Sequence, residues 1–259
     1  MTFLNIFKKR NFVIKSFGKK IEISEDEKYK TLKFNGVIQS RVNKKSVFSG
    51  EYWDLIPPVC YVFEKPNILM IGLGGGSIIK EISKIFTRAN IDVVEINNEV
   101  ISLYKNFFKD NEIEDSVKIY NKNGFDFVSS RKNTYDIIIL DAYEIDNIPE
   151  EFLTEEFVKN SYRSLKENGI LVINCIDSMI INNSLNNYLF KLDKLFSNYS
   201  LGSGFMTANK ILLCFKNLDP DESFNRICEE LSKNVSMRFL LNAYYSPVKE
   251  HSELNKVSK

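Results

Sequence analysis

The chain has 259 residues, of which 44% are hydrophobic and 27% are charged. This length and composition are typical of one large globular α/β domain with a small additional domain. The 35 Lys and Arg residues almost balance the 34 Asp and Glu residues. This balance argues against a nucleic-acid partner, because nucleic-acid-binding proteins usually carry a basic excess. Since no apolar run approaches the ~20 residues that span a bilayer, no membrane partner is expected either.

The four cysteines, Cys60, Cys175, Cys214 and Cys228, do not have the spacing of a metal site. We expect buried, reduced thiols, which favour a cytoplasmic protein. The only histidine, His251, lies in a polar C-terminal segment. Neither histidine-based catalysis nor a bound metal is therefore expected.

The first fifty residues favour β-structure. Short β-favouring runs separated by turn signals occupy residues 11–17, 20–24, 29–34 and 37–41. Asn35-Gly36 is the strongest of these signals and predicts a two-residue hairpin turn. We therefore predict a small antiparallel domain over residues 1–49. A helical connector over residues 50–66 comes next, and Pro57-Pro58 breaks or restarts that connector.

From residue 67 onward, the pattern alternates between strand and helix. Strands are expected near residues 68–72, 91–95, 117–121, 135–141 and 170–175, and helices near 77–87, 98–109, 154–167 and 183–196. Strict alternation predicts a parallel sheet covered on both faces. Two β-like runs between residues 199 and 216 are joined by residues 207–210 alone, and so short a link forces an antiparallel pair. This domain is predicted to span residues 67–245 and to close with one or two helices, before a polar tail over 246–259.

The segment from residue 67 to 97 contains the most informative motif. Its first strand ends at Gly72-Leu73-Gly74-Gly75-Gly76-Ser77, a helical pattern comes after this turn, and the second strand ends at Glu95. Glycines let backbone N–H groups approach a ligand at a helix N-terminus, because no Cβ intervenes. A carboxylate about 20 residues further on can accept both hydroxyls of a ribose. The motif predicts a nucleoside-bearing cofactor bound by Gly72, Gly74, Gly75, Gly76, Ser77 and Glu95. The alternative is a tight turn that binds nothing.

Polar residues also come directly after the third and fourth strands of this domain. Asn123-Gly124 lies after the third strand, and Asp141-Ala142-Tyr143-Glu144 lies after the fourth. Ligands of open α/β sheets bind at the carboxyl ends of the strands, so these groups should lie near the glycine motif. Asn123 and Gly124 would then lie at an adenine edge, and the acids would supply the chemistry. Asp141 could instead cap its loop, and Glu144 could be a solvated loop acid.

In order and spacing, these motifs resemble the spermidine synthase-like (polyamine aminopropyltransferase) family. The resemblance runs from about residue 21 to 216 and rests on TLKFNGVIQS, GEYW, ILMIGLGGGSIIKEI, DVVEIN, NGFDFV, YDIIILDAYE and LTEEFVKNSYRSLKENGIL. It implies a Rossmann-like α/β fold of the class I AdoMet-dependent transferase type. That fold has a mostly parallel sheet ending in an antiparallel hairpin, here preceded by the small N-terminal β domain.

The resemblance also implies an activity, namely transfer of an aminopropyl group to a small amine in polyamine biosynthesis. The co-substrate would be decarboxylated S-adenosylmethionine or S-adenosylmethionine itself, without a metal, and the resemblance implies a homodimer. Asp141 takes the place of the catalytic base beside the cofactor, Glu144 that of a second acid, and Tyr52 that of an assisting tyrosine. Gln39 stands beside the substrate channel. Tyr143 replaces a small residue and is expected to reshape the acceptor pocket, whereas Tyr52 could simply be a packing residue.

Two features depart from the family pattern. The family usually has an acid at the place of Gly75, where it grips the amine of the aminopropyl chain, and the loop Asp-Ser-Ser/Thr-Asp-Pro has become residues 141–145, DAYEI. Losing one charge-assisted contact would weaken cation binding by about 1.5–3 kcal/mol. Methyl transfer on the same fold, a non-catalytic regulatory or partner module, and a nicotinamide dehydrogenase therefore remain as alternatives. The predicted terminal hairpin disfavours the dehydrogenase.

Overall fold

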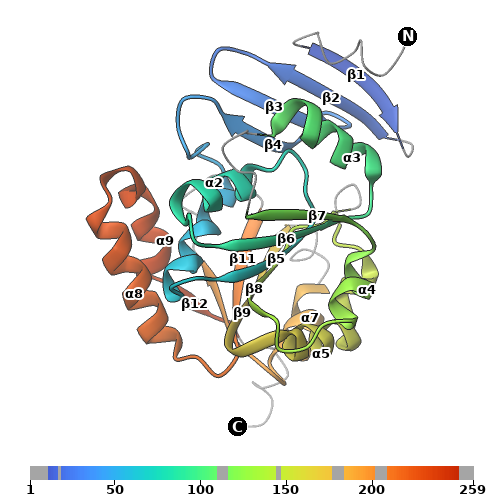
Figure 1. Ribbon diagram of the computed structural model, residues 1–259. Coiled ribbons are helices and arrows are strands. Elements are labelled where there is room, and N and C mark those ends of the chain that lie inside the picture. The colour runs from blue at the N-terminus through green and yellow to red at the C-terminus, as the bar shows by residue number, and fades with distance from the viewer. Residues whose placement is uncertain are drawn as a thin grey trace.

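The computed structural model describes residues 11–16, 19–109, 116–143, 147–176, 184–201 and 209–250. Two sheets organise this part of the chain (Figure 1). A four-stranded antiparallel sheet lies at the N-terminal end, and an eight-stranded sheet forms the centre of the larger domain. This arrangement confirms the predicted fold class.

The N-terminal sheet agrees closely with the predicted strands. It consists of β1 (Asn11–Ser16), β2 (Lys19–Glu25), β3 (Tyr29–Phe34) and β4 (Val37–Asn43). Asn35 and Gly36 join β3 to β4 with φ angles of 49° and 86°. Two consecutive positive φ angles are what a type I′ hairpin turn requires, and Asn-Gly supplies them at low steric cost.

The central sheet has the strand order β12-β10-β11-β9-β8-β5-β6-β7. Its strands are β5 (Asn67–Ile71), β6 (Asn90–Glu95), β7 (Val117–Asn121), β8 (Tyr135–Leu140), β9 (Leu165–Ile176), β10 (Ser197–Leu201), β11 (Asn209–Phe215) and β12 (Val248–Lys249). Strands β5 to β9 are parallel, whereas β11 pairs antiparallel with both β9 and β10. The chain leaves β5 toward β6 and β7 and returns on the other side as β8. The topological switch point, where ligands of such sheets bind, therefore lies between β5 and β8.

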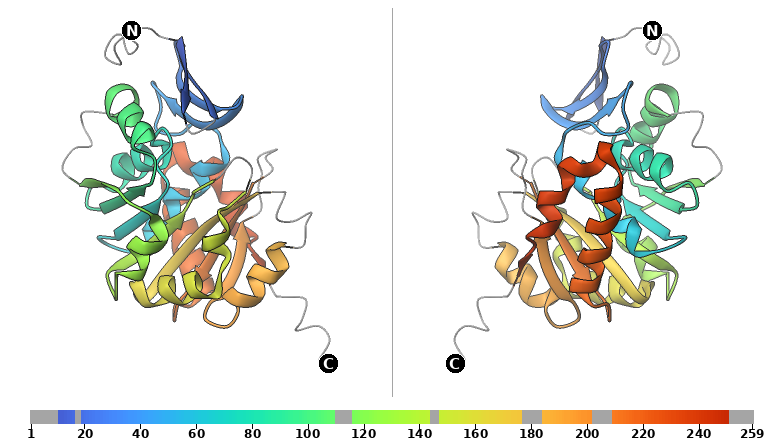
Figure 2. Two further views of the ribbon diagram at one scale, coloured as in Figure 1. Left: turned by 90° about the vertical axis from the view of Figure 1, so that its right-hand side faces the viewer. Right: turned by 90° about the vertical axis from the view of Figure 1, so that its left-hand side faces the viewer.

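Helices cover both faces of this sheet (Figure 2). The α-helices are α2 (Ser77–Ile85), α3 (Asn98–Leu103), α4 (Gly124–Ser129), α5 (Glu155–Ser164), α7 (Ser184–Leu192), α8 (Pro220–Lys233) and α9 (Leu241–Tyr245). Shorter 3₁₀ or π-helical segments are η1 (Tyr52–Leu55), η2 (Pro57–Val62), η3 (Tyr104–Phe108), η5 (Glu150–Leu153) and η6 (Val235–Leu240). One apolar cluster contains residues of α2, η1, η2 and α8, and a second contains residues of α4, α5 and α7.

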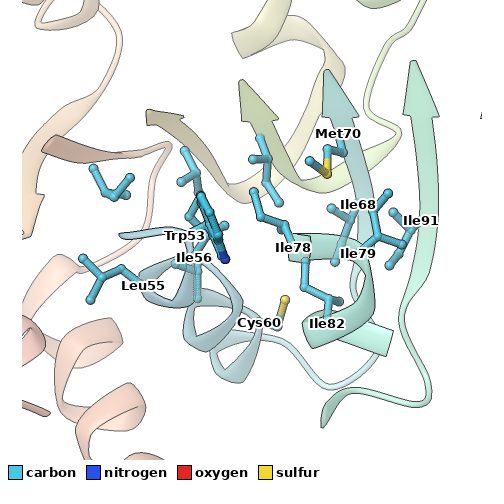
Figure 3. Packing of buried hydrophobic residues seen from close by; sticks show 14 of the residues in the cluster. Trp53, Leu55, Ile56, Cys60, Ile68, Met70, Ile78, Ile79, Ile82 and Ile91 are labelled. Carbon is cyan, nitrogen blue, oxygen red and sulfur yellow. The ribbon is translucent and has the colours of Figure 1, made fainter. Parts of the chain in front are cut away.

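Strand β5 shows why this part of the sequence is continuously apolar. Ile68 and Met70 belong to the first cluster, whereas Leu69 and Ile71 belong to the second. Successive side chains of a strand point to opposite faces, so a strand covered on both sides must be apolar at every position. Figure 3 shows the first cluster, in which Trp53 and its neighbours from η1 and η2 pack against the isoleucines of α2. This packing brings the N-terminal connector against the helix that begins after the glycine turn.

Several element boundaries differ from the predictions. The helix predicted over 154–167 ends at Ser164, and β9 begins at Leu165. Asn168 has a φ of 62°, which an α-helix cannot accommodate. The helix predicted over 98–109 ends at Leu103 and continues as the π-helical segment η3. The segment predicted as a polar tail contributes β12, which pairs with β10.

Other sequence predictions concern thiols and membranes. All four cysteines are buried with free thiols. In the part of the chain that the structure describes, no helix is long and apolar enough to cross a membrane. His251 lies outside the described residues.

Candidate active site

A cavity of about 460 Å³ opens at the carboxyl ends of β5, β6 and β8. It reaches from the glycine turn to the loop after β8 and is covered from one side by β4 and η1. Of the residues predicted for the site, it is lined by Gln39, Tyr52, Gly72, Gly74, Ser77, Glu95, Asn123, Gly124, Asp141 and Tyr143. Glu144 lies outside the described residues. The fold thus brings the strand-end residues together, as the topology requires.

The glycine turn lies directly against the loop after β8. Gly72 has a φ of 99°, and a Cβ built on it would lie 2.2 Å from the carbonyl oxygen of Asp141. The Asp141 N–H donates to the Ile71 carbonyl at 3.0 Å, which holds the two strand ends at this separation. Only glycine fits position 72, because any side chain would push the two strand ends apart.

Gly75 and Gly76 do not line the cavity. A Cβ on Gly75 would lie 2.9 Å from Ser40 Cβ and 3.2 Å from the Phe108 ring, and one on Gly76 would lie 2.3 Å from the Tyr104 ring. The turn therefore needs glycine at these positions for close packing against β4 and η3. The acid that the family resemblance implies at the place of Gly75 has no room here.

Glu95 ends β6 with its carboxylate held by the backbone. Oε2 accepts the Leu73 N–H at 3.1 Å, and Oε1 accepts the Asn97 N–H at 2.8 Å. One bond comes from the glycine turn and the other from the start of α3, so the orientation of the carboxylate is fixed by both. A carboxylate has about four acceptor sites, so it can accept hydroxyl groups as well as backbone N–H groups.

The Asn123 amide has hydrogen-bond partners at both its oxygen and its nitrogen. Its Oδ1 caps α4 by accepting the Asp126 N–H at 3.1 Å, and its Nδ2 donates to Glu151 Oε1 at 3.1 Å. The amide oxygen expected at an adenine edge is thus already the cap of a helix. Glu151 of η5, which was not among the residues predicted for the site, also lines the cavity.

Asp141 and Tyr52 both line the cavity and interact electrostatically. Burial raises the pKa of Asp141, and a hydrogen bond from Asn174 opposes this rise. Burial and the negative charge of Asp141 together hold the pKa of Tyr52 well above its usual value. The Tyr52 hydroxyl therefore keeps its proton at neutral pH and can act as a hydrogen-bond donor beside the carboxylate.

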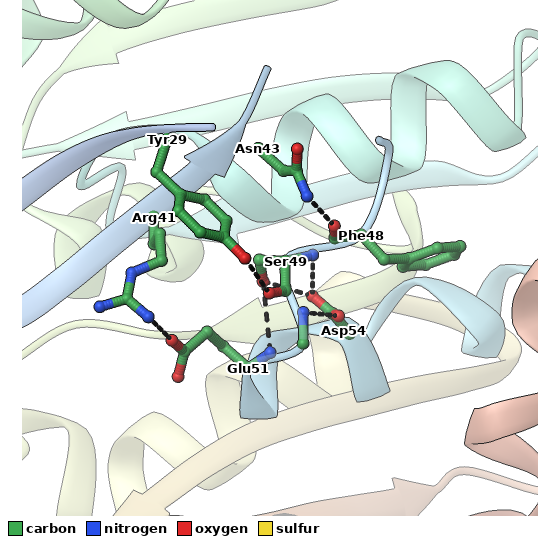
Figure 4. A network of polar contacts seen from close by, with 8 residues as sticks. Tyr29, Arg41, Asn43, Phe48, Ser49, Glu51 and Asp54 are labelled. Carbon is green, nitrogen blue, oxygen red and sulfur yellow. Dashed lines mark hydrogen bonds and ion pairs between the residues drawn. The ribbon is translucent and has the colours of Figure 1, made fainter. Parts of the chain in front are cut away.

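A buried aspartate fixes the segment that carries Tyr52 (Figure 4). Asp54 is fully buried, and its carboxylate accepts the Ser49 hydroxyl and the Gly50 N–H, each at 2.7 Å. An ion pair of 2.7 Å between Arg41 and Glu51 ties this segment to β4. Gln39, on β4, and Tyr52 therefore reach the cavity from the N-terminal side.

Asn174 contacts the predicted base, although it was not among the residues predicted for the site. It lies on β9, it is fully buried, and its Nδ2 donates to Asp141 Oδ1 at 2.7 Å. A signal was present in the sequence, since Asn174 is the single amide within the apolar run Ile170–Ile176. Buried polar side chains need partners, so such a residue next to a predicted strand-end acid could have been paired with it.

Comparisons with known proteins define the class to which this fold and site belong. Residues 56–202 match the spermine/spermidine synthase domain model, which is more than half of the chain, and the chain belongs to that family. A polyamine aminopropyltransferase from Alkaliphilus oremlandii is 38% identical over 109 residues. That match spans 41% of this chain and 38% of the relative.

Solved structures extend the likeness of fold to almost the whole chain. A probable spermidine synthase from Corynebacterium glutamicum superposes with a TM-score of 0.71 at 18% identity, covering 90% of this chain and 94% of that one. A spermidine synthase in complex with the transition-state analogue AdoDATO superposes with a TM-score of 0.69 at 20% identity, covering 96% of this chain and 84% of that one. The fold is therefore that of the spermidine synthases.

Proposed function

We propose that this protein is a transferase that binds decarboxylated S-adenosylmethionine and transfers its aminopropyl group to a small amine, in polyamine biosynthesis. One observation carries the proposal: Glu95 and Asp141 face a single cavity whose floor is the glycine turn. Of these two strand-end acids, Glu95 would accept hydrogen bonds from hydroxyl groups, and Asp141 would accept a proton. Family membership supports the same activity.

The residues of the cavity fit an adenosyl co-substrate. Glu95, oriented by two backbone N–H groups, would hold the ribose, and the turn from Gly72 to Gly74 approaches without side chains on its glycines. The volume lies within the range of about 300–1,000 Å³ that is usual for small-molecule sites. When bound, the co-substrate would supply an electrophilic carbon next to its sulfonium.

Asp141 and Tyr52 would act on the acceptor amine. An alkyl ammonium has a free pKa near ~10, so it must lose a proton before its nitrogen can attack. The Asp141 carboxylate can first hold the ammonium and then accept that proton, while the Tyr52 hydroxyl orients the nitrogen. Gln39 and Tyr143 line the same cavity and would contact the acceptor.

Transfer of a methyl group from intact S-adenosylmethionine is the second candidate, and the surroundings of Gly75 favour it. The place of the acid that would grip an aminopropyl amine is filled by Ser40 and Phe108. In addition, the N-cap residue of α2 is Gly76, which has no side chain with which to cap the helix. A helix N-terminus favours a carboxylate, which intact S-adenosylmethionine has and its decarboxylated form lacks.

Turnover assays with the two co-substrates and a panel of small diamines separate these candidates. We expect methylthioadenosine as product from decarboxylated S-adenosylmethionine. If S-adenosylhomocysteine forms from intact S-adenosylmethionine and no methylthioadenosine forms from its decarboxylated form, the protein is a methyltransferase and the proposed aminopropyl transfer is wrong. Absence of both products would leave a non-catalytic module. We also propose that the protein is cytoplasmic, which the buried, free cysteines suit, and that it forms a homodimer.

A further inference from the structure

We propose that Asn174, on β9, is the residue that positions Asp141 for proton transfer, a role that rests on the proposed transfer to an amine. The residue after Asp141 is Ala142, whose side chain cannot form a hydrogen bond with the carboxylate. The neighbouring strand supplies the holding group instead. Asn174, which also makes a side-chain hydrogen bond with Tyr52, would thus be a positioning residue, acting through these neighbours and not on the substrate.

The topology of the sheet places the two residues side by side. Strands β8 and β9 are parallel neighbours, and Leu140 pairs with Ile173. The next residues of each strand, Asp141 and Asn174, therefore meet at the same edge of the sheet. Their side chains join through a hydrogen bond of 2.7 Å from Nδ2 to Oδ1.

Two further contacts fix the orientation of Asn174. Asn209, at the start of β11, donates from Nδ2 to Asn174 Oδ1 at 2.9 Å. Because the amide oxygen is held by this donor, the amide NH₂ group must face Asp141. The Tyr143 hydroxyl also donates to the Asn174 carbonyl oxygen. Side chain and backbone of Asn174 are thus both anchored by residues of this chain.

This arrangement has a chemical consequence for Asp141. An amide NH₂ can donate a hydrogen bond to a carboxylate but cannot accept a proton from a carboxylic acid, so it favours the ionised form. The bond lowers the pKa of Asp141 against the effect of burial. Among the residues that the structure describes, the titratable side chains that interact electrostatically with Asp141 are Tyr52 and Tyr143, whose pKa values are both raised well above the usual range. Since both tyrosines are neutral near pH 7, Asn174 is the described side chain that favours the ionised form of Asp141. In this arrangement Oδ1 of Asp141 accepts the hydrogen bond from Asn174, and Oδ2 of Asp141 would accept the proton of the amine.

The experiment compares Asn174→Leu and Asn174→Asp with a matched control. Asn198, on β10, is also buried, and its Nδ2 donates to Asp193 Oδ1 at 2.6 Å. Asn198→Leu therefore removes the same kind of bond away from the cavity. Thermal unfolding and methylthioadenosine binding verify that each variant is folded. The readouts are the pH profile of turnover and the titration of ¹³C-labelled Asp141, monitored by NMR.

For Asn174→Leu, we expect turnover at neutral pH to fall about tenfold or more. The acidic limb of its pH profile should move to higher pH by about one unit. Asn174→Asp should move it further, because two adjacent carboxyl groups share a proton. Asn198→Leu should leave the profile unchanged. Asp141 titrating at the same pH in the wild type and both Asn174 variants would overturn the inference, even in an active enzyme. Absence of turnover in the wild type would instead refute the proposed function, while the NMR titration would still decide the role of Asn174.

Discussion

The Cα atom of Gly72 and the carbonyl group of Asp141 are so close that no side chain fits between them: a Cβ on Gly72 would lie 2.2 Å from that oxygen. The proposed co-substrate floor and the proposed proton acceptor thus meet at one close junction between β5 and β8. Because this junction sets the position of Asp141 relative to the glycine turn, the proposed activity depends on it.

Gly72→Ala should destabilise the protein strongly. The new methyl group meets backbone atoms, and φ is 99°, so both overpacking and backbone strain contribute, together about 3 kcal/mol or more. Gly36→Ala is the matched control, because Gly36 has a φ of 86° and no atom within 4 Å of the added Cβ. It should lose only about 1 kcal/mol. Denaturant unfolding of both variants measures this difference, and equal losses would show that the junction is not tight.

Asp141→Asn should abolish proton transfer and leave co-substrate binding intact. Removal of a general base typically reduces turnover by about 10²- to 10⁴-fold. In the wild type, burial raises the pKa of Asp141 above its usual value of 3.8. Since the ionised form is the active one, turnover should decline as the pH falls through this raised pKa. A pH series of turnover tests both points, and an Asp141→Asn variant with wild-type turnover would remove Asp141 from the mechanism.

Glu81 should make stability depend on pH. This α2 residue is 1% exposed, and burial and the nearby Asp54 hold its pKa well above the usual value of 4.5. Below pH 4.5 the acid is protonated in both the folded and the unfolded chain. As the pH rises further, the unfolded chain ionises first, so the folded state loses stability until its own raised pKa is passed.

Glu81→Gln should remove this part of the pH dependence, because an amide stays neutral and can donate to Asp54 as the protonated acid does. Unfolding free energies at pH 5 and pH 8 should differ less in the variant than in the wild type. Asp126→Asn, at an exposed position on α4, serves as the control. An unchanged pH dependence in Glu81→Gln would mean that Glu81 ionises normally in the folded protein.

An acid placed at position 75 without a second substitution should destabilise the protein. In Gly75→Asp the Cβ would lie 2.9 Å from Ser40 Cβ and 3.2 Å from the Phe108 ring, and overpacking of this kind costs about 1–3 kcal/mol. Adding Ser40→Gly should recover part of that loss by removing the nearer contact. Thermal unfolding of the single and double variants tests this, and a fully stable single variant would contradict the packing described for the glycine turn.

The sequence was sufficient for the parts of the site that depend on single strands. Gly72 and Asp141 each follow a continuous apolar run, and Glu95 follows a run interrupted only by Asp92. Parallel topology brings such strand ends together. The four N-terminal strands could be predicted from local turn signals. The terminal antiparallel pair was also predicted, but with the wrong bounds: β10 ends at Leu201, and β11 begins at Asn209, inside the link predicted over 207–210.

The remaining features depend on contacts between segments that are distant in sequence. Ser40 fills the space beside Gly75 only because β4 lies against the turn, and Asn174 is oriented by Asn209 across the β9–β11 pair. The hydrogen bond from Asn123 to Glu151 of η5 likewise joins two segments that are distant in sequence. Periodicity does not show which side chains from different elements meet, so these contacts could not be read from it.

Calorimetric titration with methylthioadenosine tests the central claim most directly, because this adenosine thioether would bind whichever group is transferred. We predict saturable binding to one site per chain and an affinity that falls about ten- to a hundredfold in Glu95→Gln, where one charge-assisted acceptor is lost. Asp126→Asn should bind like the wild type. No binding, or equal binding to wild type and Glu95→Gln, would contradict an adenosyl site at the glycine turn.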